Sequence, residues 1–465
     1  MNANHHETSG LSRTQQITLR GPAELADALP FMLGFHPTDS VVLVALHGEH
    51  GRFGGRVRLG IPGSPREWAS TADHLAECLV EGGSRHGTRP DGIVVFLCQD
   101  PAPGETARRV MERLRPFAQR LRTACGSLDI PVYEALCISD GLYFSYCCPD
   151  ARCCPPDGTP LALSGTSVMA ATATYSGVQV RGSLRDMKAR LKPSGRPGED
   201  KQRAALDAAA AAIVPRILEG AEGKGRHEVR ETTLRLARET MRRFVDPKSP
   251  ASPAGPARPA RPAGATAEGD AADDALIGTD EAAALILGLQ DRVTRDRAAE
   301  WMEGWEGTAA LRLWRVLARR CVTPYQEHAA APLTLAGWTA WSTGDEPTAR
   351  VALGLALEAD PDYVFAQLLH QACNEGLDPE SLRSCLRVER DARAASEQTG
   401  PSESRRVATR ATRPQGGRQT LRKAGRSGRR ERGPAAGVRP GGRATGRPVN
   451  RAPRRDGQRG TRSGR

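Results

Sequence analysis

The chain has 465 residues, enough for two or three domains of ordinary size, and a formal net charge of +12. The charge is unevenly distributed, because residues 401–465 hold 20 Lys and Arg against 3 acidic residues, whereas the rest holds 46 against 51. Residues 1–400 therefore give no sign of a basic nucleic-acid surface. Apolar runs reach only about six residues, far below the roughly 18–20 needed to span a bilayer.

The amino terminus and the cysteines together predict a cytoplasmic protein. The opening residues, MNANHHETSG, have no basic stretch followed by an apolar one, so no secretory signal is recognisable. Eleven cysteines is an odd number, and most of them stand in apolar or helical contexts. Such cysteines are typical of buried free thiols in a reducing compartment. Residues 1–14 are polar and are expected to be disordered.

The first predicted unit is a strand, a helix, a turn and a second strand. Residues 17–20 alternate like a short strand, Pro22 suits the first turn of a helix, and Gly34 is placed to end that helix. The apolar run from 41 to 46 is typical of a strand covered on both faces. We expect the interior of the domain to assemble around Leu25, Leu29, Leu33 and the four residues 41–44.

Strands and helices continue to alternate up to about residue 182. The further predicted elements are strands at 56–61, 93–98, 130–138 and 142–146, and helices at 64–82 and 105–125. Asp140-Gly141 is a hairpin signal between the last two strands. This order predicts an α/β fold, a mixed sheet layered with helices, over residues 15–182. No glycine-rich phosphate loop follows any predicted strand, so the sequence does not support nucleotide binding.

The second half of the chain is helical in pattern. A helical continuation is expected at 183–245, then a Pro/Ala/Gly linker at 246–274, then an all-helical domain at 275–390. Small residues at 330–361 have the spacing of one tetratricopeptide-like helix pair, with no second clean copy. Five tryptophans of this domain stand at helical spacings and are expected in its core.

The remaining residues, 391–465, are rich in Arg, Gly and Pro and are expected to form a disordered basic tail. Three interpretations of residues 401–465 remain open. The segment binds nucleic acid or another polyanion through its charge, it is a solvated tail without a function, or it is the product of a GC-rich gene read out of frame.

One string in the first unit, ITLRGPAELADALPFMLGFHPTDSVVLV, resembles the opening of an actinobacterial family known as domain of unknown function 4192. Two further strings fit that family: Ser145-Tyr146 followed by Cys148, Cys153-Cys154-Pro155-Pro156 and Gly158, and the region from Asp291 to Pro361. The resemblance covers roughly residues 15–390. It implies a fold and a lineage, but no established activity. Cys147 departs from the apolar residue expected there.

The loop between the first helix and the buried strand is the first candidate site. His36, Asp39 and Ser40 are capable of acid–base or nucleophilic chemistry within one turn. Three neighbours in a loop rarely converge as a catalytic triad requires, and all three residue types are also ordinary in turns. The loop is therefore a weak catalytic candidate, with ligand contact and a purely structural role as alternatives.

A cysteine cluster is the second candidate site, with Cys148, Cys153 and Cys154 as weak candidates for metal ligands. Four cysteines within eight residues suggest zinc or redox chemistry. The spacing is not that of a common zinc site, and adjacent cysteines seldom both reach one ion. Remote ligands such as His47 or Cys137, a disulfide between Cys148 and Cys153, and simple packing all remain open.

These observations favour a cytoplasmic, non-catalytic interaction or regulatory protein with an unknown protein partner and no cofactor other than zinc. One alternative is an enzyme of unknown reaction whose site is the loop of His36, Asp39 and Ser40, because open α/β sheets bind ligands beyond their strand ends. Another is association with nucleic acid through residues 401–465. A deep pocket containing His36 and Asp39 would favour the enzyme, and an apolar groove among the helices of 308–375 would favour the interaction protein.

Overall fold

In this computed structural model the described residues are 21–48, 51–85, 89–161, 167–175, 177–193, 198–219, 223–245 and 267–398. All of them belong to one compact unit, residues 1–398. The expected strand at 17–20, the expected disorder of residues 1–14 and the basic tail 401–465 lie outside the described residues. None of the described helices is long and apolar enough to cross a membrane.

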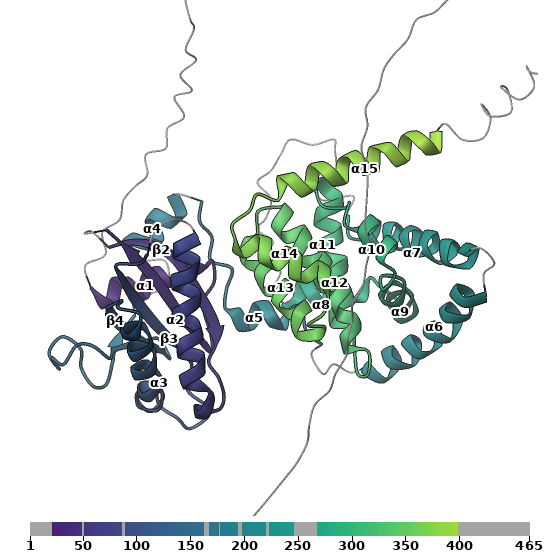
Figure 1. Ribbon diagram of the computed structural model, residues 1–465. Coiled ribbons are helices and arrows are strands. Elements are labelled where there is room, and N and C mark those ends of the chain that lie inside the picture. Colours follow the sequence, from purple (N-terminus) through teal and green to yellow (C-terminus); the bar gives the residue numbers. More distant parts are fainter. Residues whose placement is uncertain are drawn as a thin grey trace, which may run out of the picture. The chain divides into compact units, whose positions relative to one another are not determined.

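A sheet lies in the first part of the unit (Figure 1). It has six strands in the order β2-β1-β3-β4-β5-β6. β3 and β4 pair in parallel, and the other neighbours pair in antiparallel fashion, so the predicted mixed sheet is confirmed. The strands are β1 (Ser40–His47), β2 (Arg52–Gly60), β3 (Gly92–Cys98), β4 (Val132–Ser139), β5 (Leu142–Ser145) and β6 (Thr159–Pro160).

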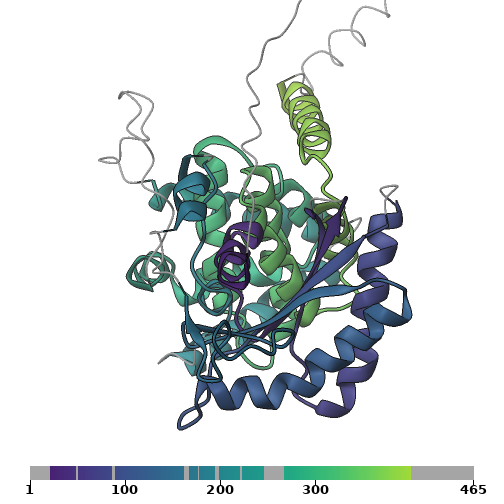
Figure 2. The ribbon, with the colours of Figure 1, turned by 90° about the vertical axis from the view of Figure 1, so that its left-hand side faces the viewer.

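The central strands β1 and β3 are buried on both faces, and successive residues of each strand point to opposite sides of the sheet. Val41 and Leu43 of β1 pack with α2 (Trp68–Arg85) and α3 (Ala107–Ser127), which lie on the same side of the sheet (Figure 2). Val42 and Val44 pack on the other face, in a core that also contains α1 (Pro22–Leu33) and helices of the second half. The interior predicted around β1 is confirmed, except that Leu25 is only partly buried.

α1 begins and ends where the sequence predicts. Pro22 occupies its first turn, where a missing N–H has no cost. Gly34 closes it in the left-handed conformation, with φ of 81°, and its N–H donates to the carbonyl of Pro30 at 2.8 Å. A Cβ at Gly34 would lie 2.3 Å from Cγ of Pro347, so this turn also allows a close approach to the start of α13 (Glu346–Ala359).

The second half is helical, as predicted. Its helices are α4 (Val168–Tyr175), α5 (Leu184–Ala189), α6 (Glu199–Glu219), α7 (Lys224–Arg243), α8 (Ala267–Ala275), α9 (Thr279–Gly288), α10 (Arg292–Ala298), α11 (Gly304–Arg319), α12 (Ala330–Ser342), α13 (Glu346–Ala359), α14 (Val364–Asn374) and α15 (Glu380–Gln398). α12 and α13 approach closely at Gly337, where a Cβ would lie 2.6 Å from Cγ of Leu353.

Two segments are more helical than the sequence indicates. α8 occupies the end of the segment expected to be a linker, of which residues 246–266 lie outside the described residues. α15 continues to Gln398, into the segment expected to be disordered. Among the tryptophans expected in the helical core, Trp305 is an exception, because about half of its surface (48%) is exposed, whereas Trp301, Trp314, Trp338 and Trp341 are buried.

Candidate functional site

A cleft lies at the edge of the sheet where β3 and β4 end. Because β1 runs antiparallel to β3, Ser40 at the start of β1 pairs with Cys98 at the end of β3. The loop before β1 is therefore placed beside the residues that follow β3 and β4. This is the edge at which α/β sheets commonly hold ligands.

The cleft, which we call the sheet-edge cleft, has a volume of about 930 Å³ and is lined by residues of α1, α4 and the strand ends. This volume suits an organic molecule of ordinary drug size. Its apolar lining includes Ala26, Leu29, Phe31, Ile138, Leu161 and Ala170. Its polar lining includes Asp27, His36, Gln99, Asp100, Thr174 and Ser183.

The charges of the sheet-edge cleft have one sign. Among its described lining residues, the charged side chains are Asp27 and Asp100, and none is Lys or Arg. Arg185, which is not part of the lining, lies 4.0 Å from Asp100 and 3.3 Å from Asp39. Asp100 is itself exposed, so its carboxylate is open to solvent and to a ligand.

His36 is held in the cleft by its backbone. Its N–H donates to the carbonyl of Gly182 at 2.8 Å, and its carbonyl accepts from the N–H of Leu184 at 2.9 Å. Although the side chain keeps contact with solvent, partial burial lowers the pKa of the imidazole below its usual 6.5. His36 is therefore neutral at pH 7 and can accept a hydrogen bond through one ring nitrogen.

The other two residues of the predicted loop site do not join His36. Asp39, in the left-handed conformation with φ of 47°, pairs with Arg185 and accepts a bond from Gln99 at 3.4 Å. Ser40 is fully buried, donates to the carbonyl of Thr38 at 2.8 Å and accepts from Arg58 at 3.2 Å. The loop is thus not a nucleophile–base arrangement, since both side chains bond to other partners.

Two acidic residues of the cleft, Asp27 and Asp100, are not among the site residues predicted from the sequence. Asp100 comes two residues after the buried strand β3, which is a usable signal, because such positions fall at the ligand edge of the sheet. Asp27 stands on α1 between the buried residues Ala26 and Ala28, and nothing in its local sequence distinguishes it from a solvated helix residue.

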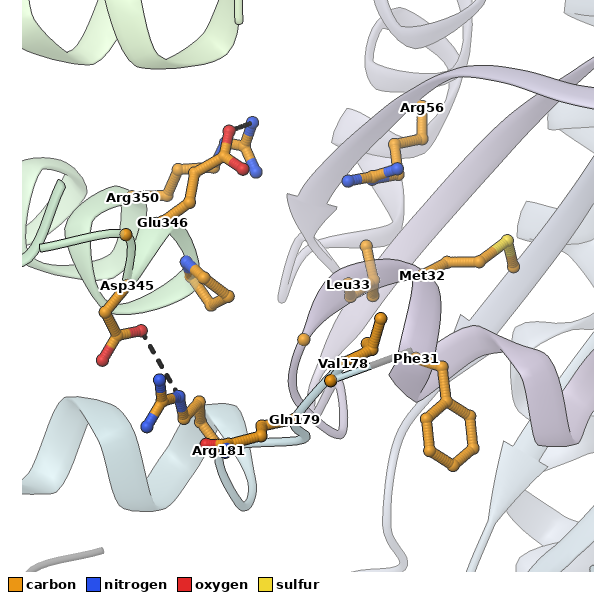
Figure 3. Close-up of a pocket in the computed structure, with 14 residues that line it drawn as sticks. Phe31, Met32, Leu33, Arg56, Val178, Gln179, Arg181, Asp345, Glu346 and Arg350 are labelled. Atoms are coloured by element: carbon orange, nitrogen blue, oxygen red, sulfur yellow. Dashed lines mark hydrogen bonds and ion pairs between the residues drawn. The ribbon is translucent and has the colours of Figure 1, made fainter. Parts of the chain in front are cut away.

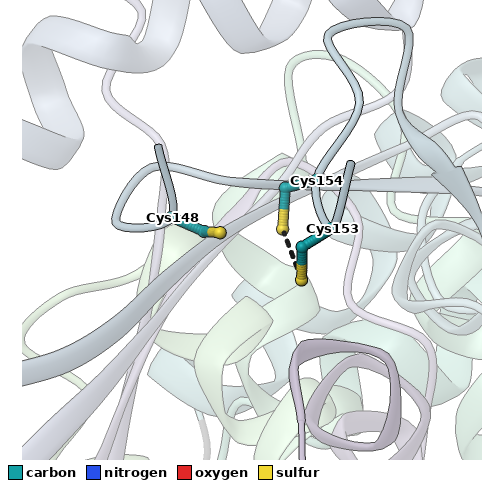
Figure 4. Close-up of side chains that lie close together, drawn as sticks. All are labelled: Cys148, Cys153 and Cys154. Carbon is teal, nitrogen blue, oxygen red and sulfur yellow. Dashed lines mark hydrogen bonds between the residues drawn. The ribbon is translucent and has the colours of Figure 1, made fainter. Parts of the chain in front are cut away.

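The cysteine loop brings together the three thiols that the sequence names as candidates. Every pair of Sγ atoms among Cys148, Cys153 and Cys154 lies within 4.8 Å, and those of Cys153 and Cys154 are 3.9 Å apart (Figure 4). Burial and the neighbouring thiols raise the pKa of Cys154 to about 12. The suggested remote ligands, His47 and Cys137, are not part of this group, and Cys137 is fully buried beneath α2 and α3.

A second cavity, of about 450 Å³, lies between the end of α1 and the start of α13 (Figure 3). Its charged residues largely neutralise one another. Arg181 lies 3.6 Å from Asp345, and Arg350 pairs with Glu346. We assign no chemistry to this cavity, because these ion pairs are structural contacts: Arg181 and Asp345 join its two walls, and Arg350 and Glu346 pair within α13.

The fold and the cleft define an α/β protein with a mixed six-stranded sheet, a ligand-sized cleft at one edge of that sheet, and a helical second half. The model of the family described as domain of unknown function (DUF4192) matches residues 22–380, so the chain belongs to that family. No curated protein and no solved structure matches the chain.

Proposed function

We propose that the protein is a cytoplasmic, non-catalytic regulatory protein that binds a small amine-bearing molecule in the sheet-edge cleft. The observation that supports this most is the combination of an apolar lining with charges from Asp27 and Asp100. An apolar body would replace water against the lining, and an ammonium group would pair with a carboxylate.

The charge of the cleft argues for the chemistry of the ligand. A phosphate or carboxylate ligand would face two carboxylates without a lining cation among the described residues, which costs electrostatic energy. An ammonium ligand meets carboxylate acceptors and the neutral imidazole of His36, which also accepts hydrogen bonds. Each of these polar contacts also fixes the orientation of the ligand, as in other small-molecule sites.

Binding is favoured over catalysis because the reactive side chains are engaged elsewhere. Asp39 is paired with Arg185, and Ser40 is buried with its hydroxyl bonded to the backbone. Of the three residues first considered for catalysis, only His36 remains in the cleft. A protein partner for the helical half, and polyanion binding by residues 401–465, stay predictions beside this proposal.

The test is a thermal-shift screen of the full-length protein against matched pairs of compounds. Each pair has the same aromatic or alkyl body and carries either an amine or a carboxylate, such as 2-phenylethylamine and phenylacetate. We expect concentration-dependent stabilisation by amines only, because a ligand that binds only the folded state raises its stability. Asp100→Asn and Asp27→Asn should each weaken amine binding by about 10-fold, the value of one charge-assisted hydrogen bond.

The matched control is Asp73→Asn, because Asp73 is an exposed carboxylate on α2 and does not line the cleft. This variant should bind amines as the unchanged protein does. The proposal fails if carboxylates stabilise the protein as well as amines do, or if Asp73→Asn and Asp100→Asn lose the same affinity. Turnover of a bound amine by the unchanged protein, lost in His36→Ala, would favour the enzyme instead.

A further inference from the structure

We propose that Cys148, Cys153 and Cys154 form a binding site for one closed-shell thiophilic metal ion, with zinc as the first candidate. The site is separate from the sheet-edge cleft, because none of the three cysteines lines that cleft. Three thiolates would bind the ion, and the fourth position would remain open to solvent or to an external ligand. Zinc accepts such an arrangement of three protein ligands and one exchangeable ligand.

The distances suit a single ion. A metal–sulfur distance of about 2.3 Å at tetrahedral angles places two sulfurs roughly 3.8 Å apart. The Sγ atoms of Cys153 and Cys154 are 3.9 Å apart, and no pair in the group exceeds 4.8 Å. The three sulfurs therefore need to move by about 1 Å or less to share one ion, which rotation about χ1 supplies.

Apolar packing does not explain why these thiols converge. Other cysteines of the chain, such as Cys98, Cys125 and Cys321, belong to the two hydrophobic cores that cover the sheet faces and fill the helical half. Cys148, Cys153 and Cys154 belong to neither core, and Cys153 is exposed. Three thiols that meet outside a core, near solvent, are better explained by a shared ligand than by burial.

Hydrogen bonds and prolines of the loop restrain the backbone around the three cysteines. The carbonyl of Asp150 accepts from the N–H groups of Cys153 and Cys154 at 3.1 and 2.8 Å. The N–H of Cys148 donates to Oγ of Ser145 at 2.9 Å, and this hydroxyl in turn donates to Glu134 at 2.8 Å. Pro149, Pro155 and Pro156 further restrict the backbone on both sides of the thiols. These restraints reduce the conformational entropy that the loop would lose when it binds an ion.

The closest pair of thiols does not favour a disulfide. Cys153 and Cys154 are adjacent, and a disulfide between neighbours forces an unfavourable peptide geometry. In the metal site each thiol loses one proton to the buffer as the ion binds, so three protons are released per ion and no oxidant is needed. An ion of charge +2 with three thiolates has a net charge of −1, which is tolerated because the loop is open to solvent.

The experiment titrates Zn²⁺ and, in a separate arm, Cu⁺ into the reduced, metal-free, full-length protein in competition with a chromophoric chelator. We expect one ion per chain, three thiols protected from alkylation, and three protons released. Single substitutions Cys148→Ser, Cys153→Ser and Cys154→Ser should each weaken binding by more than about 100-fold, beyond the usual effect of losing a supporting residue. Tight binding of Cu⁺ with weak binding of Zn²⁺ would still support a thiophilic site and would identify its metal.

Two cysteine controls and one supporting residue complete the test. Cys385→Ser removes another exposed thiol, and Cys147→Ser removes the neighbour that packs on the core below α2 and α3, so both should bind the ion normally. Ser145→Ala removes the acceptor of the Cys148 N–H and should weaken binding by about 10-fold without changing the stoichiometry. Circular dichroism of each variant establishes that the fold is retained.

Three results would overturn the proposal. The first is the absence of one-to-one binding of either ion by the reduced protein. The second is binding that the three substitutions leave unchanged or that Cys385→Ser reduces equally. The third is a disulfide joining two of the three thiols in protein isolated under reducing conditions, which would assign the cluster to redox chemistry.

Discussion

Glu281 combines two roles at the start of α9. Its carboxylate accepts two hydrogen bonds from Arg243, at 2.7 and 2.8 Å, and one from the N–H of Gly278 at 2.9 Å. The bonds from Arg243, followed by the capping bond, lower the pKa of Glu281 to about 2. The residue therefore connects α7 to α9 and satisfies a free N–H at a helix end.

Because its pKa is lowered, the contribution of Glu281 to the stability of the fold depends on pH. Since the folded pKa is about 2 and the usual pKa is 4.5, the stabilisation is complete above pH 4.5 and is lost as the pH falls through 2. We expect Glu281→Gln to lower the urea midpoint of unfolding at pH 7 and to have little effect near pH 2. Glu389→Gln, an exposed carboxylate of α15, should change neither. A difference between Glu281→Gln and the unchanged protein that is constant over this range would refute the assignment.

At the level of single residues, the sequence indicated His36 but not its companions. His36 was recognisable because it stands between a helix-ending glycine and a buried strand. Asp39 and Ser40 shared that signal, but their side chains are bound by residues that the local sequence does not indicate. Asp39 pairs with the distant Arg185, and Ser40 accepts from Arg58 of the neighbouring strand. Asp27 depends on which face of α1 borders the cleft, which only the packed structure defines.

At the level of the element, the turn that ends α1 is sensitive to substitution of Gly34. Gly34 has φ of 81°, and a Cβ there would lie 2.3 Å from the ring of Pro347. The left-handed conformation costs other residues roughly 1–2 kcal/mol, and overpacking adds about 1–3 kcal/mol.

We therefore expect Gly34→Ala to lower the free energy of unfolding by about 2–5 kcal/mol, measured by urea denaturation. Gly82→Ala is the matched control, because Gly82 lies inside α2 with nothing within 4 Å of a Cβ. That substitution should raise stability by about 0.5–1 kcal/mol through helix propensity. Equal effects of the two substitutions would contradict the described turn.

Helices with an apolar stripe were predictable from the sequence, and α8 was not. Its sequence, AEGDAADDA, has no apolar periodicity and follows a Pro-rich stretch. Distant arginines stabilise it instead. Arg190 bonds to Asp270 at 2.8 Å, and Arg312 pairs with Asp273, which is only 6% exposed. Helix formation that depends on buried ion pairs from other helices leaves no local signal.

Across the whole described unit, the continuous apolar run of β1 proved the most informative pattern. Its apolar run predicted burial on both faces, and its residues do enter two different cores. One core lies under α2 and α3, and the other extends from the opposite face into the helices of the second half. The sheet-edge cleft lies beyond the covered strands, where β3 and β4 end.

The proposed function requires that the sheet-edge cleft is the ligand site. The direct measurement is amide hydrogen exchange of the full-length protein with and without the tightest-binding amine of the screen. We predict slower exchange at the ends of β3 and β4, in the loop around His36 and at residues 177–180, which line the cleft. Protection confined to α13, α14 and α15, or to the cysteine loop, would contradict the claim.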